Sequence, residues 1–140
     1  MIFQLISATG IKYDDDAYEV LVPTQGGVIA LYENHMPLIS AGAPGVLSVR
    51  KMASDTEQAM EHFAVYGGVV QIDGKTARFI TDDVTTTDEV SETEAQAALE
   101  RAEELVKNAE SRTALHEARN VQRQHEVRLH LAQLKTRHHR

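Results

Sequence analysis

The chain has 140 residues, of which 42% are hydrophobic and 25% charged, so it is neither disordered nor fibrous and is long enough to bury a real core. A net charge of -7 argues against a protein that coats nucleic acid, because binding phosphates requires clustered lysine and arginine. The absence of cysteine excludes disulfides, thiol catalysis and cysteine-ligated zinc. No apolar run approaches the roughly 18 residues of a membrane span, and we expect no export signal.

The first 84 residues have the composition of a β domain. All eight glycines, all three prolines and all seven aromatic residues lie before residue 80. The spacing of short β-prone segments predicts an antiparallel β-sandwich or flattened barrel, since no room is left for crossover helices. The expected strands are 2–7, 18–22, 28–32, 46–50, 59–65, 69–72 and 76–81. Turns are expected at 9–10, 23–27, 42–45, 67–68 and 73–74, and Asp73-Gly74 gives the strongest hairpin signal.

Residues 85–140 have a helical pattern and form the second predicted domain. Ser91 and Glu94 have the spacing of a capping box at the start of the first helix, and Ser111 is placed to cap a second. Apolar residues then recur every three or four positions in each helix, which predicts a helical hairpin. They are Ala95, Ala98, Leu99, Ala102, Leu105, Val106 and Ala109 in the first helix, and Leu115, Ala118, Val121, Val127, Leu129, Leu131, Ala132 and Leu134 in the second.

No motif in the sequence assembles a catalytic or metal site. Phosphate-loop, dinucleotide, nucleophile-elbow and zinc-helix signatures are absent, and Gly67-Gly68 has no lysine beside it. The run 14–16 of three aspartates is interpreted as a solvated loop in preference to a cation site. Glu126 and His130 lie one helical turn apart and are interpreted as an exposed face in preference to a metal pair. The sequence therefore predicts a non-catalytic protein without a cofactor or metal.

Two signatures in the first domain resemble a known family. The segment 22–39 reads VPTQGGVIALYENHMPLI and is followed by Pro44-Gly45, and the segment 66–72 reads YGGVVQI. This order of a glycine turn, a strand, Asn-His-x-Pro-Leu and Pro-Gly, with a later Gly-Gly before a strand, resembles the epsilon subunit of bacterial F-type ATP synthases. The matching length and the alanine-rich helical hairpin extend the resemblance over nearly the whole chain.

The resemblance implies a sandwich of about ten strands and a two-helix C-terminal domain. It also implies a non-catalytic subunit of the rotary central stalk, which contacts the gamma subunit and the c-ring and couples proton-driven rotation to ATP synthesis. Such a protein is peripheral, on the cytoplasmic side of the bacterial plasma membrane, and meets the membrane only through its complex. The interface residues it implies are Glu33, Asn34, His35, Met36 and Pro37. For His35, a direct c-ring contact and a hydrogen bond to the backbone of its own loop remain equally open.

The resemblance has departures in both predicted domains. In the first, many relatives carry an acidic residue where Val28 stands and a glycine where Ala30 stands. Some relatives bind ATP through an Ile/Leu-Asp-x-x-Arg-Ala motif, which aligns here with residues 90–95 and carries Ser91 for the aspartate and Glu94 for the arginine. Because a carboxylate in place of a guanidinium repels phosphate, we predict that the helical domain does not bind ATP.

The C-terminal segment is basic although the whole chain is acidic. Residues 112–140 carry seven basic and two acidic side chains with five histidines, whereas residues 88–110 carry two basic and eight acidic ones. In the resembling family the last helix inserts between alpha, beta and gamma subunits and inhibits ATP hydrolysis. The candidate inhibitory contacts are Arg112, Arg119, Arg123, Arg128 and Lys135, followed by Arg137 and Arg140. Alternatively, this basic face pairs with the acidic first helix. The histidines predict stronger inhibition toward pH 6.

Two further functions remain open from the sequence. One is a free-standing interaction adaptor that dimerises through its helical hairpin. The other is an enzyme whose site is assembled from scattered polar residues. Recovery of the chain with a large membrane ATPase, as a soluble homodimer or with small-molecule turnover would distinguish the three functions.

Overall fold

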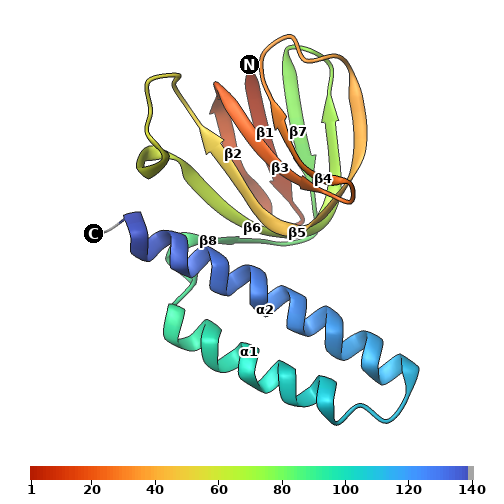
Figure 1. Ribbon diagram of the computed structural model, residues 1–140. Coiled ribbons are helices and arrows are strands. Elements are labelled where there is room, and N and C mark those ends of the chain that lie inside the picture. The colour runs from red at the N-terminus through yellow and green to blue at the C-terminus, as the bar shows by residue number, and fades with distance from the viewer. Residues whose placement is uncertain (139–140) are drawn as a thin grey trace.

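The computed structural model describes the backbone of residues 1–138 and the side chains of residues 1–135. A β-sandwich lies against two antiparallel helices, with α2 (Arg112–His138) next to the sandwich and α1 (Glu92–Lys107) on the far side of α2 (Figure 1). The eight described strands are β1 (Ile2–Ser7), β2 (Gly10–Asp16), β3 (Glu19–Thr24), β4 (Gly27–Leu31), β5 (Leu38–Arg50), β6 (Glu61–Ile72), β7 (Thr76–Ile80) and β8 (Val84–Thr86). Short 3-10 turns span Glu57–Ala59 and Thr87–Glu89.

One continuous sheet folds over to form both layers of the sandwich. Its strand order is β2-β1-β7-β6-β5-β3-β4, and β8 also pairs with β6. Every pair is antiparallel except β1 with β7, which run parallel. The predicted sandwich and helical hairpin are confirmed.

Two long bent strands explain why the described residues hold eight strands and not about ten. β5 has 13 residues and β6 has 12, and each runs through both layers. The turns expected at 42–45 and 67–68 were therefore wrong, because these glycines lie inside β5 and β6. Gly68 has φ of 146°, and a Cβ there would lie 2.4 Å from the carbonyl oxygen of Ile80, so the bend requires glycine.

The aspartate run 14–16, expected in a loop, belongs to the edge strand β2, which pairs with β1. The prediction failed because Tyr13 fixes the segment: its ring packs 5.8 Å from that of Phe3, whereas the carboxylates stay exposed. The hairpin at Asp73-Gly74 is confirmed between β6 and β7. The Asp73 carboxylate accepts hydrogen bonds from the backbone N–H groups of Lys75 and Thr76, and Gly74 has φ of 104°.

Alternate residues of the strands point inward and form the main core. The largest fully buried side chains there are Phe3, Leu5, Val20, Val22, Leu31, Leu47, Val49, Val65, Val70 and Phe79. Both layers contribute to this set, so the bent sheet encloses a single hydrophobic interior.

Both predicted helix caps are present. The Ser91 hydroxyl accepts from the Glu94 N–H at 3.5 Å, and the Ser111 hydroxyl accepts from the Ala114 N–H at 3.0 Å. α1 buries only one narrow stripe, formed by Ala95, Leu99 and Ala102.

α2 has more apolar positions than α1 covers, and the sandwich covers the others. Leu131 is fully buried, and it forms a second apolar cluster with Val127, Ala132, Ala64, Val90 and Ala95. Burying a leucine side chain stabilises a contact by about 1.5–3 kcal/mol. In this closed arrangement α2 is therefore the layer that joins α1 to the sandwich. Arg137, His138, His139 and Arg140 lie outside the residues whose side chains are described.

Candidate partner-binding surfaces

The loop of residues 33–37, here called the His loop, joins β4 to β5 and is held at its base. Asn34 has φ of 65°, and its N–H donates to the carbonyl oxygen of Gly74 at 2.9 Å, so the loop lies against the β6–β7 turn. The His35 N–H donates to the carbonyl oxygen of Tyr32 at 3.2 Å. The Tyr32 hydroxyl donates to the Glu19 carboxylate, which raises the pKa of Tyr32. The position of the loop is therefore fixed on both sides.

The side chains of the His loop differ in exposure. Met36 is 75% exposed, and Glu33, Asn34 and Pro37 are also exposed. His35 is half-buried, and its Nδ1 atom lies 2.7 Å from the carbonyl oxygen of Met36. The loop thus presents an apolar tip on a fixed backbone, while the His35 ring hydrogen-bonds within the loop.

A row of apolar side chains crosses five strands on the outer face of the sandwich. Ala41 pairs with Val69, Val69 with Ile80, Ile80 with Ile6, and Ile6 with Ile11, so all five side chains lie on one face. Val69 is 44% exposed, Ile80 45% and Ile11 59%. We call these five residues the apolar row.

A polar row runs beside the apolar row on the same face. The Arg78 Nε donates to Gln4 Oε1 at 2.9 Å, and the Gln4 Nε2 donates to Asp14 Oδ1 at 3.3 Å. This surface is not predictable from the sequence, because alternation marks one side of each strand as apolar but does not show which outward residues become neighbours. The strand order supplies that information.

The basic residues of α2 divide into two sets in the closed arrangement. Arg112, Arg119 and Arg123 are exposed. The other two contact the rest of the chain: the Arg128 Nε donates to the Tyr66 hydroxyl at 3.0 Å, and the Lys135 Nζ donates to the carbonyl oxygen of Val90 at 3.4 Å. The five predicted contact residues therefore do not form one surface here.

The structure records three ion pairs in the described part of the chain. Among the residues whose side chains are described, they join Glu19 to Arg50, Asp15 to Lys51 and Glu104 to Lys107, and none of these three links α1 to α2. Between described residues, the hairpin is held by apolar packing and by hydrogen bonds from Arg128 and Lys135 to neutral oxygen atoms.

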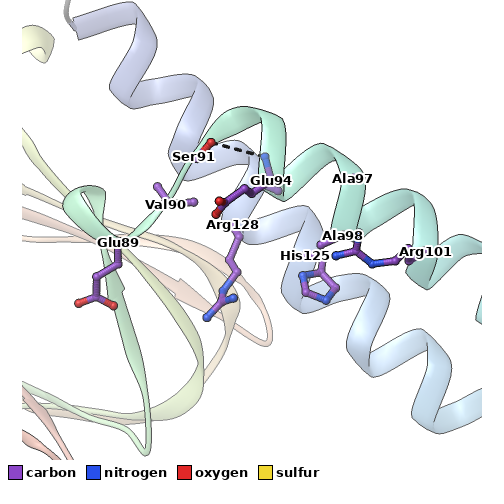
Figure 2. Close-up of a pocket in the computed structure, with 10 residues that line it drawn as sticks. Glu89, Val90, Ser91, Glu94, Ala97, Ala98, Arg101, His125 and Arg128 are labelled. Carbon is purple, nitrogen blue, oxygen red and sulfur yellow. Dashed lines mark hydrogen bonds between the residues drawn. The ribbon is translucent and has the colours of Figure 1, made fainter.

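A hollow of about 370 Å³ lies where α1 begins and passes over α2 (Figure 2). The segment aligned with the ATP motif lines it through Val90, Ser91 and Glu94, and a second carboxylate comes from Glu89. Its cationic side chains are Arg101 from α1 and Arg128 from α2, and the ring of His125 lies between the helices. Two carboxylates thus oppose two guanidinium groups around the hollow.

In the described part of the chain, neither helix is both long and apolar enough to cross a membrane. Within those residues, no group of three or more histidine, aspartate or glutamate side chains is arranged to hold a metal ion.

The chain is similar to known proteins in sequence and in fold. A family model described as "ATP synthase, Delta/Epsilon chain, beta-sandwich domain" matches residues 1–87. The ATP synthase epsilon chain of Gloeobacter violaceus is 26% identical over 129 residues, covering 92% of this chain and 94% of that protein. The epsilon chain of Neisseria meningitidis serogroup B is 29% identical over 133 residues, covering 95% of this chain and 89% of that protein.

Two solved structures share the fold. A chain of the Euglena gracilis mitochondrial ATP synthase, in a structure titled "OSCP/F1/c-ring in rotational state 1", has a TM-score of 0.79 at 15% identity and covers 90% of this chain and 77% of its own. A chain of the Tetrahymena thermophila mitochondrial ATP synthase "central stalk/cring" structure has a TM-score of 0.63 at 16% identity and covers 94% and 96%. Because the family model spans more than half of the 140 residues, the chain belongs to the delta/epsilon chain family of ATP synthase, a family of non-catalytic subunits.

Proposed function

We propose that this chain is a rotor subunit of the central stalk, which couples rotation of the c-ring to ATP synthesis and restrains ATP hydrolysis through its C-terminal helices. Residues 1–84 form the coupling part and residues 85–140 the regulatory part. Family membership and the c-ring and central-stalk titles of the two structural neighbours support this role.

The observation that carries the coupling role is the apolar row. A row of five neighbouring apolar side chains, four of them exposed and Ile6 half-buried, on a chain of net charge -7 is typical of a surface covered by a partner. The bent sheet and its single core keep this row rigid, as torque transmission requires. We assign the apolar row to the gamma subunit.

The His loop is the second coupling surface. Its exposed tip at Met36 stands on a backbone anchored to Gly74 and Tyr32, so a load on the tip passes into the sandwich. We assign Glu33, Asn34, His35, Met36 and Pro37 to the contact with the c-ring or the gamma subunit. Through this contact the chain is peripheral to the membrane, on the cytoplasmic side in a bacterium.

The regulatory role is supported by the way in which α2 is held. Arg128 and Lys135 contact the sandwich and its linker, whereas Arg112, Arg119 and Arg123 are exposed. Release of α2 frees Arg128 and Lys135 and extends a basic helix with exposed apolar positions, which matches an acidic groove formed by a loop of the beta subunit. The closed and released forms then differ by only a few kcal/mol.

The experiment removes residues 111–140 and measures ATP hydrolysis by the assembled complex. The regulatory role predicts that the deletion raises the hydrolysis rate several-fold, while the complex still contains the shortened chain. An unchanged rate would remove the regulatory half of the proposal. A second variant replaces Arg112, Arg119 and Arg123 with glutamine in the full chain. It keeps both helices and tests the basic side chains alone, and it is expected to give part of the same increase in the hydrolysis rate.

The alternative of an adaptor that dimerises through its hairpin is not favoured. The buried stripe of α1 is packed against α2, and the buried face of α2 is packed against α1 and the sandwich. Both faces are therefore covered by contacts within one chain and are not free to form a dimer. The relatives of the chain are ATP synthase subunits.

A further inference from the structure

His125 occupies the contact between the two helices. Its ring lies beside Ala98 and Arg101 of α1, as Figure 2 shows, and it is half-buried. Its Nδ1 atom is buried and has no hydrogen-bond partner among the described residues. A neutral imidazole tolerates this position, whereas an imidazolium would bury an N–H donor without an acceptor.

Cations flank the ring from both helices. Arg128 stands three residues further along α2 and therefore on the same face, and Arg101 approaches from α1. The carboxylates of Glu94 on α1 and of Glu89 in the preceding 3-10 turn line the same hollow. The pKa of His125 is lowered, mainly by burial and then by the charges of Arg128 and Arg101. The two carboxylates therefore do not offset these effects.

Arg128 is the charged residue that connects the surroundings of His125 to the sandwich. Its guanidinium donates to the Tyr66 hydroxyl of β6, which lies 2.7 Å from the Thr85 hydroxyl of β8. Asp82 and Asp83 line a second hollow, on the sandwich side of Arg128. A charge on His125 would therefore repel the residue that ties α2 to the sandwich and, at the same time, the arginine of α1.

We propose that His125 is a pH-sensitive latch, which holds the hairpin closed on the sandwich when its ring is neutral and releases α2 when the ring is protonated. This inference rests on the proposed regulatory function and names the residue that controls it. The other four histidines of the segment 112–140 are not needed for the response.

The direction follows from proton linkage. The pKa of His125 is lower in the closed form than its ordinary value of 6.5, so closure is fully supported above that value. As the pH falls from 6.5 toward the lowered pKa, the ratio of closed to open forms decreases by at most about tenfold per pH unit, because one proton is involved. Mild acid therefore favours the released form.

The experiment measures native-state amide hydrogen exchange of the full isolated chain at pH 7.0 and pH 5.5, as protection factors corrected for the intrinsic effect of pH. An undocked helix of this composition frays, so the amides of α2 around Val127 and Leu131 report release. We expect their protection to fall several-fold at the lower pH, while the amides of β6 remain unchanged as the internal reference.

Substitutions identify the group. His125→Gln keeps a neutral polar side chain and is expected to make the protection of α2 independent of pH. His116→Gln changes an exposed histidine of the same helix and is expected to keep the wild-type response. Arg101→Gln keeps the ring and removes one flanking cation, so its loss of protection at pH 5.5 is expected to be smaller than in the wild type.

A wild-type loss of α2 protection that persists in His125→Gln would overturn the latch, as would a wild-type chain without any such loss. If His125→Gln does not fold, Arg101→Gln alone carries the test. These measurements use the isolated chain and not the assembled ATP synthase. A negative result would therefore contradict the latch without contradicting the regulatory function that the hydrolysis experiment tests. Conversely, a deletion of 111–140 without effect on hydrolysis leaves the latch as a property of the chain.

Discussion

The sandwich and the helical hairpin are stabilised in different ways. The sandwich encloses large, fully buried side chains such as Phe3, Phe79 and Leu47, and its bend is fixed by glycines that no other residue replaces without strain. The hairpin buries alanines and a few larger residues, and it is attached through one helix by a small apolar cluster and two hydrogen bonds from basic side chains. The rigid sandwich is suited to transmitting force, whereas the weakly attached hairpin is suited to separating from the sandwich. The following substitutions test that contrast.

Phe79→Ala is expected to have the largest effect, because the ring is fully buried against the paired Gly42 of β5 and Gly68 of β6, where a Cβ on Gly42 would come within 2.6 Å of it. The free energy of unfolding of the sandwich should fall by about 3–5 kcal/mol, measured by urea denaturation. Ile39→Ala, at a side chain that is 72% exposed, is the control and should change it by less than about 0.5 kcal/mol. Equal losses in the two variants would contradict the assignment of the core.

Leu131→Ala should destabilise the closed hairpin by about 2–5 kcal/mol, because this side chain is fully buried between α2 and the sandwich. Amide exchange should show the loss in the helices, with the protection of β6 nearly unchanged. Leu105→Ala, at a side chain of α1 that is 56% exposed, is the control and should leave both parts intact. If the sandwich lost protection together with the helices, the two parts would be one cooperative unit and the contrast would fail.

Gly68→Ala should destabilise the sandwich by about 1–3 kcal/mol, since φ is 146° and the new Cβ would meet the Ile80 carbonyl oxygen and the Phe79 ring. Gly10→Ala is the matched control, because Gly10 also has a positive φ of 134° but has open space around it. The difference between the two thermal midpoints isolates the steric part of the effect. A smaller loss at Gly68 than at Gly10 would show that the bend is not sterically fixed.

Ser91→Ala and Ser111→Ala should each cost about 1 kcal/mol of helix stability, because each removes a hydroxyl that accepts a first-turn N–H. Circular dichroism during thermal unfolding measures the loss. Thr113→Ala, an exposed substitution in the first turn of α2, serves as the control and should be neutral or slightly stabilising. Two serine variants as stable as this control would argue against the caps.

ATP should give no heat of binding in isothermal titration of the full chain. Glu94 and Glu89 line the same hollow as Arg101 and Arg128, so phosphate groups that enter it meet two carboxylates as well as two guanidinium groups. Glu94→Arg is the informative variant, because it restores the charge found in the resembling motif and should create measurable affinity if this hollow is the equivalent site. Tight binding of ATP by the wild type would contradict the prediction.

The local signals of the sequence were sufficient for the helical part. Two serines at cap positions and apolar residues at three- and four-residue spacings fixed the start of both helices and the break between them. The Asp73-Gly74 hairpin was found for the same reason, since its turn chemistry is contained in adjacent residues.

Longer-range features were not predictable in this way. Gly67 and Gly68 have the composition of a turn, yet both lie within β6: Gly68 pairs with Gly42 of β5, and the next residue, Val69, pairs with Ile80 of β7. The parallel pairing of β1 with β7 and the apolar row depend on strand order, which no local pattern encodes. His125 interrupts the apolar pattern of α2. Its two arginine neighbours come from different helices, so their proximity follows from the packing of α1 on α2 and not from the local sequence.

The coupling role itself is tested most directly by proton-driven ATP synthesis. Membrane vesicles that contain the complex assembled with the full chain are compared with vesicles that lack the chain, at the same measured proton gradient. We predict that ATP synthesis is largely lost without the chain and is restored when the purified chain is added back, and that a chain with Val69 and Ile80 replaced by aspartate does not restore it. Normal synthesis in the vesicles that lack the chain would contradict the account.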